Sequence, residues 1–222
     1  DGSEGFTHNT ITASSDLANS AYAADLDGDG DVDVLSGYSN DNMMAWYEND
    51  GSEGFTEHTF SISGGSVYAA DVDGDGDMDV LSASYEDDKI AWYENDGSES
   101  FTEYAISTSA NSAHCVYAND VDNDGDIDVL SASRNDNKIA WYENNGSESF
   151  TEHAISTSAD GAYSIYAADV DGDGDMDVLS ASASDDKIAW YENNGSESFT
   201  EHTISTNANY AMFVYATDVD SD

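Results

Sequence analysis

Short apolar runs alternate with acidic and Asn/Gly-rich segments along the whole chain. Between residues 66 and 106 four β-prone runs can be distinguished, namely Val67–Ala70, Met78–Ala83, Ile90–Glu94 and Phe101–Ile106. Within the third run Trp92 and Tyr93 are neighbours, so they point to opposite faces of the predicted strand. No stretch has the sustained 3.6-residue periodicity of an amphipathic helix. The pattern predicts an all-β protein.

The same pattern recurs along the chain with a nearly constant period. The first aspartates of successive acidic segments are 46, 49, 49 and 49 residues apart, at Asp25, Asp71, Asp120, Asp169 and Asp218. Each of the first four is followed by a tryptophan and then a phenylalanine, the tryptophans being Trp46, Trp92, Trp141 and Trp190. Four antiparallel strands with this period are typical of a β-propeller blade. A linear β-solenoid is the alternative, but it does not need an Asn-Gly or Asp-Gly hairpin in every repeat.

We therefore expect residues 1–222 to form a single β-propeller repeat region. Complete blades are predicted at 21–62, 66–106, 115–155 and 164–204. A lone outer strand, Phe6–Thr12, is expected within 1–20, and a partial blade with the first strand Met212–Asp218 within 212–222. This arrangement predicts a fragment of a larger, about seven-bladed propeller. Its open edges would pair with further repeats, or head to tail with another copy of the chain.

The charge balance requires neutralisation by cations. The chain has 4 Lys and Arg residues against 48 Asp and Glu residues, a formal net charge of -44. Such a charge opposes compaction unless cations bind. It also argues against nucleic acid and anionic membranes as partners, because both require basic patches. No apolar run reaches the length of about 20 residues that membrane insertion needs.

Each acidic segment has the pattern Asp-x-Asp-Gly-Asp-Gly-x-x-Asp. Alternate residues of a tightly curled loop can direct their oxygens to one centre, and the glycine at position six permits the sharp turn. Calcium takes six to eight hard oxygen ligands. The predicted ligand residues of four full calcium sites are Asp25, Asp27, Asp29, Asp31 and Asp33; Asp71, Asp73, Asp75, Asp77 and Asp79; Asp120, Asp122, Asp124, Asp126 and Asp128; and Asp169, Asp171, Asp173, Asp175 and Asp177. Position seven is expected to supply its backbone carbonyl. A fifth, partial site contains Asp218, Asp220 and Asp222.

Other interpretations of these loops fit less well. An EF-hand needs flanking helices and a glutamate at position twelve, where this chain has Ser36, Ser82, Ser131 and Ser180. Zinc would require His or Cys ligands, and magnesium requires stricter octahedral geometry. A solvated acidic turn without metal would leave five like charges close together in every repeat.

Several further residues have a structural and a functional interpretation. His58, His153 and His202 share one position, which in the second repeat is Tyr104, so a packing or surface role is favoured over metal binding or catalysis. The tryptophans are expected between blades rather than in a sugar site. Cys115 aligns with Ser20, Ser66 and Ser164 and is expected to be a small buried thiol. Asn145 and Asn194 begin candidate glycosylation sequons.

The acidic loops, the strand Asp79–Ser82 and the segment Ile90–Asn95 resemble the VCBS/FG-GAP repeat family, which includes the calcium-binding propeller of integrin α-subunits. The resemblance implies a propeller with calcium between the first two strands of each blade, and an extracellular or cell-surface location. The integrin-type repeat has Gly-Ala-Pro after the second strand, whereas this chain has Ser82-Ala83-Ser84. This difference favours the VCBS-like branch.

Three functions remain open: a calcium-stabilised module for adhesion or protein–protein contact, a lectin-like carbohydrate binder, and a structural subunit of a surface appendage or filament. No nucleophile and base recur together, and near-identical repeats argue against a single active site, so no enzymatic activity is expected. Variable residues gather at the end of the blades opposite the acidic loops, and variable surfaces favour recognition. A protein or glycan partner is expected there, at Tyr38, Tyr85, Arg134 and Tyr163.

Overall fold

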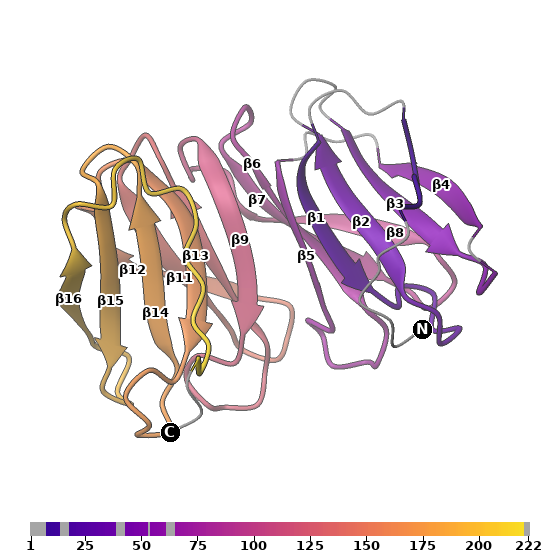
Figure 1. The fold of residues 1–222 in the computed structure, drawn as a ribbon. Helices are drawn as coiled ribbons and strands as arrows, with labels where there is room; N and C mark the ends of the chain where they lie inside the picture. The colour runs from indigo at the N-terminus through magenta and orange to yellow at the C-terminus, as the bar shows by residue number, and fades with distance from the viewer. Residues whose placement is uncertain (1–7, 14–17, 39–42, 53, 61–64, 220–222) are drawn as a thin grey trace.

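The structure is a computed structural model that describes residues 8–13, 18–38, 43–52, 54–60 and 65–219. These residues form sixteen β-strands and no helix, as the sequence pattern predicts. The strands make four separate four-stranded antiparallel sheets, one for each repeat (Figure 1).

Each sheet is built from four consecutive strands. The first repeat contains β1 (Ala18–Ala24), β2 (Asp33–Tyr38), β3 (Met43–Asn49) and β4 (Phe55–Phe60). The second contains β5 (Ser66–Ala70), β6 (Asp79–Ser84), β7 (Lys89–Asn95) and β8 (Phe101–Ser107). The third contains β9 (Ala113–Asn119), β10 (Asp128–Ser133), β11 (Lys138–Asn144) and β12 (Phe150–Ser156). The fourth contains β13 (Ala162–Ala168), β14 (Asp177–Ser182), β15 (Lys187–Asn193) and β16 (Phe199–Ser205).

Within each sheet, every strand pairs with the strands that precede and follow it in the sequence, so each sheet is a simple meander. The acidic loop joins the first and second strands, and the Asn/Gly-rich hairpin joins the third and fourth; we call this side of a repeat the loop end. The opposite side, with the turn between the second and third strands and the connection to the next repeat, is the turn end. The first strands of successive repeats, β1, β5, β9 and β13, contact one another in order (Figure 1).

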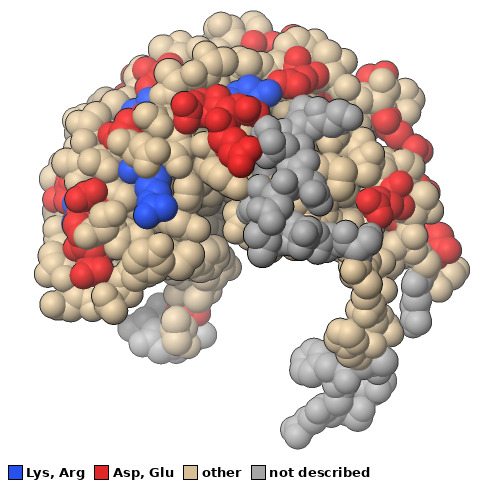
Figure 2. Space-filling model, turned by 90° about the horizontal axis from the view of Figure 1, so that it is seen from above, with Lys and Arg blue, Asp and Glu red and all other residues tan. Residues whose placement is uncertain are grey.

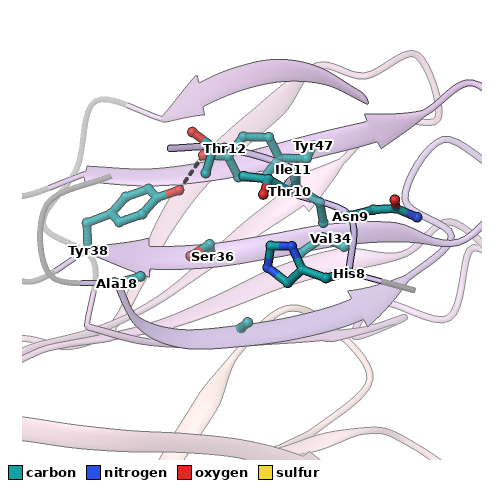
Figure 3. A pocket seen from close by; sticks show the side chains of 11 residues that line it. His8, Asn9, Thr10, Ile11, Thr12, Ala18, Val34, Ser36, Tyr38 and Tyr47 are labelled. Atoms are coloured by element: carbon teal, nitrogen blue, oxygen red, sulfur yellow. Dashed lines mark hydrogen bonds between the residues drawn. The ribbon is translucent and has the colours of Figure 1, made fainter. Parts of the chain in front are cut away.

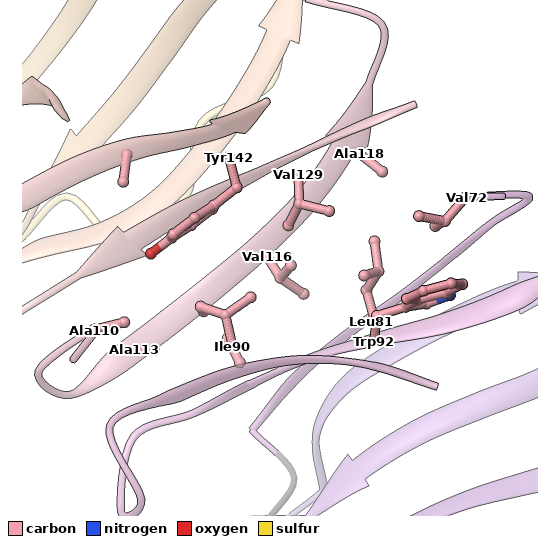
Figure 4. Packing of buried hydrophobic residues seen from close by; sticks show 12 residues of the cluster. Val72, Leu81, Ile90, Trp92, Ala110, Ala113, Val116, Ala118, Val129 and Tyr142 are labelled. Atoms are coloured by element: carbon pink, nitrogen blue, oxygen red, sulfur yellow. The ribbon is translucent and has the colours of Figure 1, made fainter. Parts of the chain in front are cut away.

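The hydrophobic core lies between neighbouring sheets and is produced by the two-residue period of the strands. In β6, Val80 packs toward the first repeat and Leu81 toward the third. In β7, Tyr93 packs toward the first repeat and Trp92 toward the third. Figure 4 shows the core between the second and third repeats, where Trp92 and Leu81 meet Val116 and Val129. Because both faces are covered, all six residues of β6 are buried.

Three of the four tryptophans occupy the positions between sheets that the sequence predicts, and the fourth, Trp190, is partly exposed on the last sheet. Trp46, Trp92 and Trp141 are each 1% exposed. Each ring meets the edge of a phenylalanine from the next repeat, as Trp92 does with Phe150 at a centroid distance of 6.3 Å. Removal of these large apolar surfaces from water stabilises the contact between repeats.

The two lone strands that the sequence predicts are not formed within the described residues. Phe6 lies outside them, and His8–Thr12 crosses one face of the first sheet beside Val34 and Tyr47 (Figure 3). The corresponding face of the second sheet packs against the preceding repeat. Met212–Asp218 also lacks strand pairing, although Val214 N donates to Ser164 Oγ of β13 at 3.3 Å. Within the described residues, neither segment exchanges a ladder of backbone hydrogen bonds with a strand.

Candidate metal centres

The acidic loops are tightly curled, as the glycine positions predict. The position-six glycines have φ angles of 95° to 102°, in the region that favours glycine: Gly30, Gly76, Gly125 and Gly174. Aspartate side chains also accept backbone N–H groups two residues further along. In the second loop, Asp73 Oδ1 accepts from Asp75 N at 3.1 Å and Asp75 Oδ1 from Asp77 N at 2.9 Å. These local bonds hold successive carboxylates on the inside of the curl.

Three carboxylates from each loop converge. In the second, third and fourth loops they come from positions one, three and nine, and in the first loop from positions one, three and five. In each group, one oxygen from every residue lies within 4.8 Å of the others, the groups being Asp25, Asp27 and Asp29; Asp71, Asp73 and Asp79; Asp120, Asp122 and Asp128; and Asp169, Asp171 and Asp177. Every described repeat therefore has an acidic cluster at the same place in its sheet.

The position-nine aspartate is buried and joins the loop to the sheet. Asp79 is 0% exposed; its Oδ2 accepts from Val72 N at 2.9 Å and its Oδ1 from Asn95 N at 2.8 Å. Burial raises the pKa of Asp79 to about 6, although these backbone hydrogen bonds oppose the rise. The same two contacts and the same pKa of about 6 recur at Asp128. In the first loop Asp33 is bonded in the same way by Leu26 N and Asn49 N.

The position-seven carboxylates lie apart from the other three. The side chain of Asp77 lies against Gly97 in the hairpin between β7 and β8, and Asp31, Asp126 and Asp175 face the equivalent hairpin glycines. The side chain at position seven is thus directed toward the hairpin. The expected metal contact through its backbone carbonyl stays a prediction. The fifth loop is described only as far as residue 219; Asp218 is exposed, and Asp220 and Asp222 lie outside the described residues.

The electrostatics of the loops favour a cation. Desolvation raises the pKa of Asp73 and of Asp122, and the neighbouring carboxylates raise it further. Asp25 Oδ1 and Asp120 Oδ1 are buried without a hydrogen-bond donor. A hard cation would provide the missing partner, since all of the converging donors are carboxylate oxygens. The donor set therefore fits calcium.

The basic residues of the chain do not reach these loops. The lysines pair with outer-strand glutamates, Lys89 with Glu103 at 2.5 Å and Lys138 with Glu152 at 2.7 Å. Lys187 pairs with Glu201 at 2.9 Å, and Arg134 lies at the turn end next to His114. Seen from above, acidic side chains are spread over the surface and basic ones are few (Figure 2). None of the four basic side chains therefore neutralises an acidic loop.

The hairpin asparagine connects each loop to the preceding repeat, a role that the sequence analysis missed. Asn95 Nδ2 donates to Leu26 O of the first repeat at 2.9 Å and to Met78 O of its own repeat at 3.2 Å. Its Oδ1 accepts from Gly97 N at 3.2 Å. Asparagine recurs at this position as Asn49, Asn95, Asn144 and Asn193. An asparagine close to a glycine is typical of a turn, so the pattern does not indicate a contact between repeats. The hairpin itself is longer than a tight two-residue turn, and Gly97 and Glu99 within it have left-handed backbone conformations.

At the turn end, the structure brings together some of the variable residues. His114 meets Tyr85 at a ring-centroid distance of 5.7 Å and Tyr163 at 4.5 Å, both edge to face. Burial lowers the pKa of His114, and the charge of Arg134 lowers it further. These three rings, from three successive repeats, and the Arg134 guanidinium form a cluster that we call the aromatic cluster.

Tyr38 does not belong with these residues. The sequence analysis placed it in the same slot as Tyr85, but the strand register sets Tyr38 opposite Met43, where Ser84 lies opposite Lys89. Tyr38 is 1% exposed and its hydroxyl bonds that of Tyr47 (Figure 3). The error is a one-residue misalignment, which moves a strand side chain to the opposite face.

The remaining predicted residues have local partners. Asn145 and Asn194 are exposed in hairpins, and their Oδ1 atoms accept from Ser147 N and Ser196 N at 3.0 and 3.1 Å. The Cys115 thiol lies between β9 and β13, with Sγ 3.9 Å from Ile165 O, and burial raises its pKa. Among the described residues, no helix is both long and apolar enough to cross a membrane.

The fold and its acidic loops define a class of β-sheet repeat protein with one carboxylate cluster per repeat. Residues 25–82, 71–131, 120–180 and 171–222 match the FG-GAP-like repeat, so the chain belongs to the FG-GAP-like repeat family. No curated protein matches the chain in a sequence comparison.

Solved structures share the fold. The V. cholerae biofilm matrix protein Bap1 is 23% identical, with a TM-score of 0.51 over 85% of this chain and 28% of Bap1. A protein from Lactobacillus plantarum is 13% identical, with a TM-score of 0.57 over 86% of this chain and 56% of that protein. The chain thus spans less than two thirds of either protein.

Proposed function

We propose that this chain is a calcium-stabilised, non-catalytic extracellular repeat module for adhesion or protein–protein interaction. The observation that carries the proposal is the recurrence of a converging carboxylate cluster in every described repeat. Membership of the FG-GAP-like repeat family and similarity to a biofilm matrix protein support it. The near-identical repeats support a role without catalysis, because an active site needs residues that only one repeat supplies.

Calcium would stabilise the contact between repeats as well as each loop. A cation among Asp71, Asp73 and Asp79 offsets their mutual repulsion and favours the ionised form of the buried Asp79. Asp79 in turn accepts a hydrogen bond from Asn95 N, and the Asn95 side-chain amide donates a hydrogen bond to Leu26 O of the preceding repeat. Loss of the cation should therefore weaken the attachment of the second sheet to the first.

The same proposal extends to the arrangement of the four sheets relative to one another. Four meander sheets with adjacent first strands fit a sector of a propeller of about seven blades, and further repeats would complete it. Blade boundaries near 21–62, 66–106, 115–155 and 164–204 belong to this proposal. An electron-microscopy or crystal structure of the intact protein would test the closure and the blade number.

Calcium binding is tested by titration and melting of the calcium-free chain. Isothermal titration calorimetry should give four equivalents of bound calcium per chain. Excess chelator should lower the melting temperature, because calcium that binds only the folded state stabilises it. Asp71→Asn should remove one equivalent, whereas Asp96→Asn, in the exposed hairpin of the same repeat, should remove none. An unchanged melting curve in chelator, or equal effects of the two substitutions, would contradict the proposal.

The aromatic cluster favours a protein or glycan ligand at the turn end. Aromatic rings stack on sugar faces and also anchor protein interfaces, and the cluster unites rings from three repeats. A lectin-like function is therefore the second candidate. Glycan-array binding that Tyr163→Ala abolishes and Tyr104→Ala leaves intact would select it. Binding that survives Tyr163→Ala would place the ligand elsewhere.

Self-association is the third candidate, and it rests on the face beyond β13. Phe213 is 76% and Tyr215 61% exposed, and the Tyr215 ring lies 4.7 Å from that of Tyr166. The same tyrosine contact joins successive repeats, as Tyr68 and Tyr117 do at 4.8 Å. Another repeat or another copy could continue the series head to tail, as a filament subunit requires. Analytical ultracentrifugation in calcium tests this, since a concentration-independent monomer mass would oppose it.

A further inference from the structure

A second kind of potential ligand set lies outside the acidic loops. Glu143 of β11, His153 of β12 and Glu197 of the hairpin after β15 each direct one ligand atom to a common region within 4.8 Å. Glu143 and His153 come from the third repeat, whereas Glu197 comes from the fourth. His153 Nε2 lies 2.7 Å from Glu143 Oε2. The group thus spans the junction between two repeats.

The surroundings hold these side chains in place. The His153 ring stacks on the buried Trp141 at a centroid distance of 4.7 Å and an angle of 27°. Glu197 has a φ angle of 57°, a left-handed conformation that is uncommon for residues other than glycine. His153 and Glu143 are partly exposed and Glu197 is exposed, so a solvated ion can enter and keep water ligands.

The chemistry of this set differs from that of the acidic loops. One imidazole nitrogen and two carboxylates suit zinc and similar transition metals, whereas calcium selects oxygen ligands. Tetrahedral zinc with ligands at about 2.0–2.2 Å separates its donor atoms by roughly 3.4 Å. The pair at 2.7 Å must therefore open slightly, whereas Glu197 already has an oxygen within 4.8 Å of both atoms. Small movements of this kind are within reach of the two glutamate side chains, since Glu143 is partly exposed and Glu197 is exposed.

We propose that Glu143, His153 and Glu197 bind a divalent transition-metal ion, such as zinc, at the junction of the third and fourth repeats. The ion would join the two repeats on the outer side of the sheets, separately from calcium. Water would complete the coordination.

The other repeats provide natural comparisons. In the second repeat, Tyr104 takes the histidine position and hydrogen-bonds Glu94, and the charge of Glu148 also acts on it. The junction of the second and third repeats therefore has both carboxylates, Glu94 and Glu148, and lacks only the imidazole. In the fourth repeat, His202 pairs with Glu192 at 2.6 Å, but the described residues supply no hairpin glutamate from a further repeat. At the junction of the first and second repeats, the homologous residues are Glu48 and His58 of the first repeat and Glu99 of the second.

The test is zinc titration of the 222-residue chain in excess calcium, which keeps zinc out of the acidic loops. All samples carry His58→Tyr, so that the first-repeat residues do not contribute. His153→Tyr should remove one zinc equivalent and should fold normally, because the second repeat has tyrosine at this position. His202→Tyr should remove none, and Tyr104→His should add one. On zinc addition, side-chain ¹⁵N NMR should show a shift of His153 Nε2.

The proposal and the calcium function fail in different ways. Zinc binding that persists in His153→Tyr, or that Tyr104→His does not increase, would overturn the zinc site and leave calcium binding untouched. Displacement of all zinc by calcium would also overturn it, because the ion would then reside in the acidic loops. Melting temperatures of the variants in calcium confirm that the folded chain is being compared.

Discussion

Asn144, the last residue of β11, donates its side-chain amide to the backbone carbonyl of Val72, in the acidic loop of the preceding repeat, at 2.9 Å. Its backbone N–H donates to Asp128 Oδ1, in the acidic loop of its own repeat, at 2.7 Å. One residue therefore joins two candidate metal centres. The same contacts recur at Asn95 and Asn193, so the second, third and fourth loops are each tied to the loop before them.

Replacement of this asparagine should weaken the contact between repeats. Asn144→Ala removes the buried bond to Val72 O and the partly buried bond to Ile127 O. We expect a loss of about 2–3 kcal/mol in the free energy of unfolding, measured by urea denaturation in calcium. Asn145→Ala, at an exposed position next to it, should cost less than about 1 kcal/mol.

The first repeat provides a matched control. Asn49 Nδ2 donates to Val32 O of its own repeat, a solvent-exposed bond, in place of a carbonyl of another repeat. Asn49→Ala should therefore destabilise the chain less than Asn144→Ala. Equal losses would show that the asparagine acts within its own hairpin rather than between repeats.

Acidification should stabilise the calcium-free chain. The pKa of Asp79 and of Asp128 is about 6 in the folded state, above the ordinary aspartate value of 3.8. Between these two values the folded state binds protons that the unfolded state does not, so stability rises as the pH falls through 6. The calcium-free melting temperature should increase from about pH 7 to about pH 5.

The stabilisation that calcium adds should shrink over the same range, because the ion must displace these protons. Melting curves with and without calcium should therefore approach one another as the pH falls. A constant difference between the two curves would show that these aspartates do not compete with the ion.

The cysteine interrupts a series of serine contacts between first strands. Ser66 Oγ accepts from Val116 N at 3.4 Å, and Ser164 Oγ accepts from Val214 N at 3.3 Å. Cys115 stands at the same position, where its thiol lies near Ile165 O. Cys115→Ser should replace a weak sulfur hydrogen-bonding group with a stronger hydroxyl beside the Ile165 backbone and raise the unfolding free energy by up to about 1 kcal/mol. Ser66→Cys should lower the free energy of unfolding. If Cys115→Ser also lowers it, the packing of the thiol matters more than the hydrogen bond that serine gains.

The hairpin glycine is required for two reasons. Gly97 has a φ angle of 71°, and a Cβ atom there would overlap the carboxylate of Asp77. Gly97→Ala should cost roughly 1–2 kcal/mol from the backbone alone, and more from the overlap. Glu99→Gly, at a φ of 61° two residues later, should be nearly neutral because strain relief offsets the added chain entropy. Thermal unfolding in calcium gives both values, and a neutral Gly97→Ala would contradict the assigned role of Asp77.

The sequence by itself determined the strands and the composition of the acidic loops. The four predicted runs in residues 66–106 agree with β5–β8 to within one residue at every boundary. The two-residue period also placed Trp92 and Tyr93 on opposite faces of that strand. These features depend on neighbours in the chain: backbone alternation, turn glycines and hydrogen bonds over two or three residues.

Only the tertiary structure decided which residues meet across repeats. The amide of Asn144 reaches Val72, 72 residues away, and His153 meets Glu197, although the sequence presents them as turn and surface residues. The tertiary structure also set the register that buries Tyr38. Such contacts depend on how two sheets are placed against each other. That placement results from the summed packing of many side chains, which a local pattern does not encode.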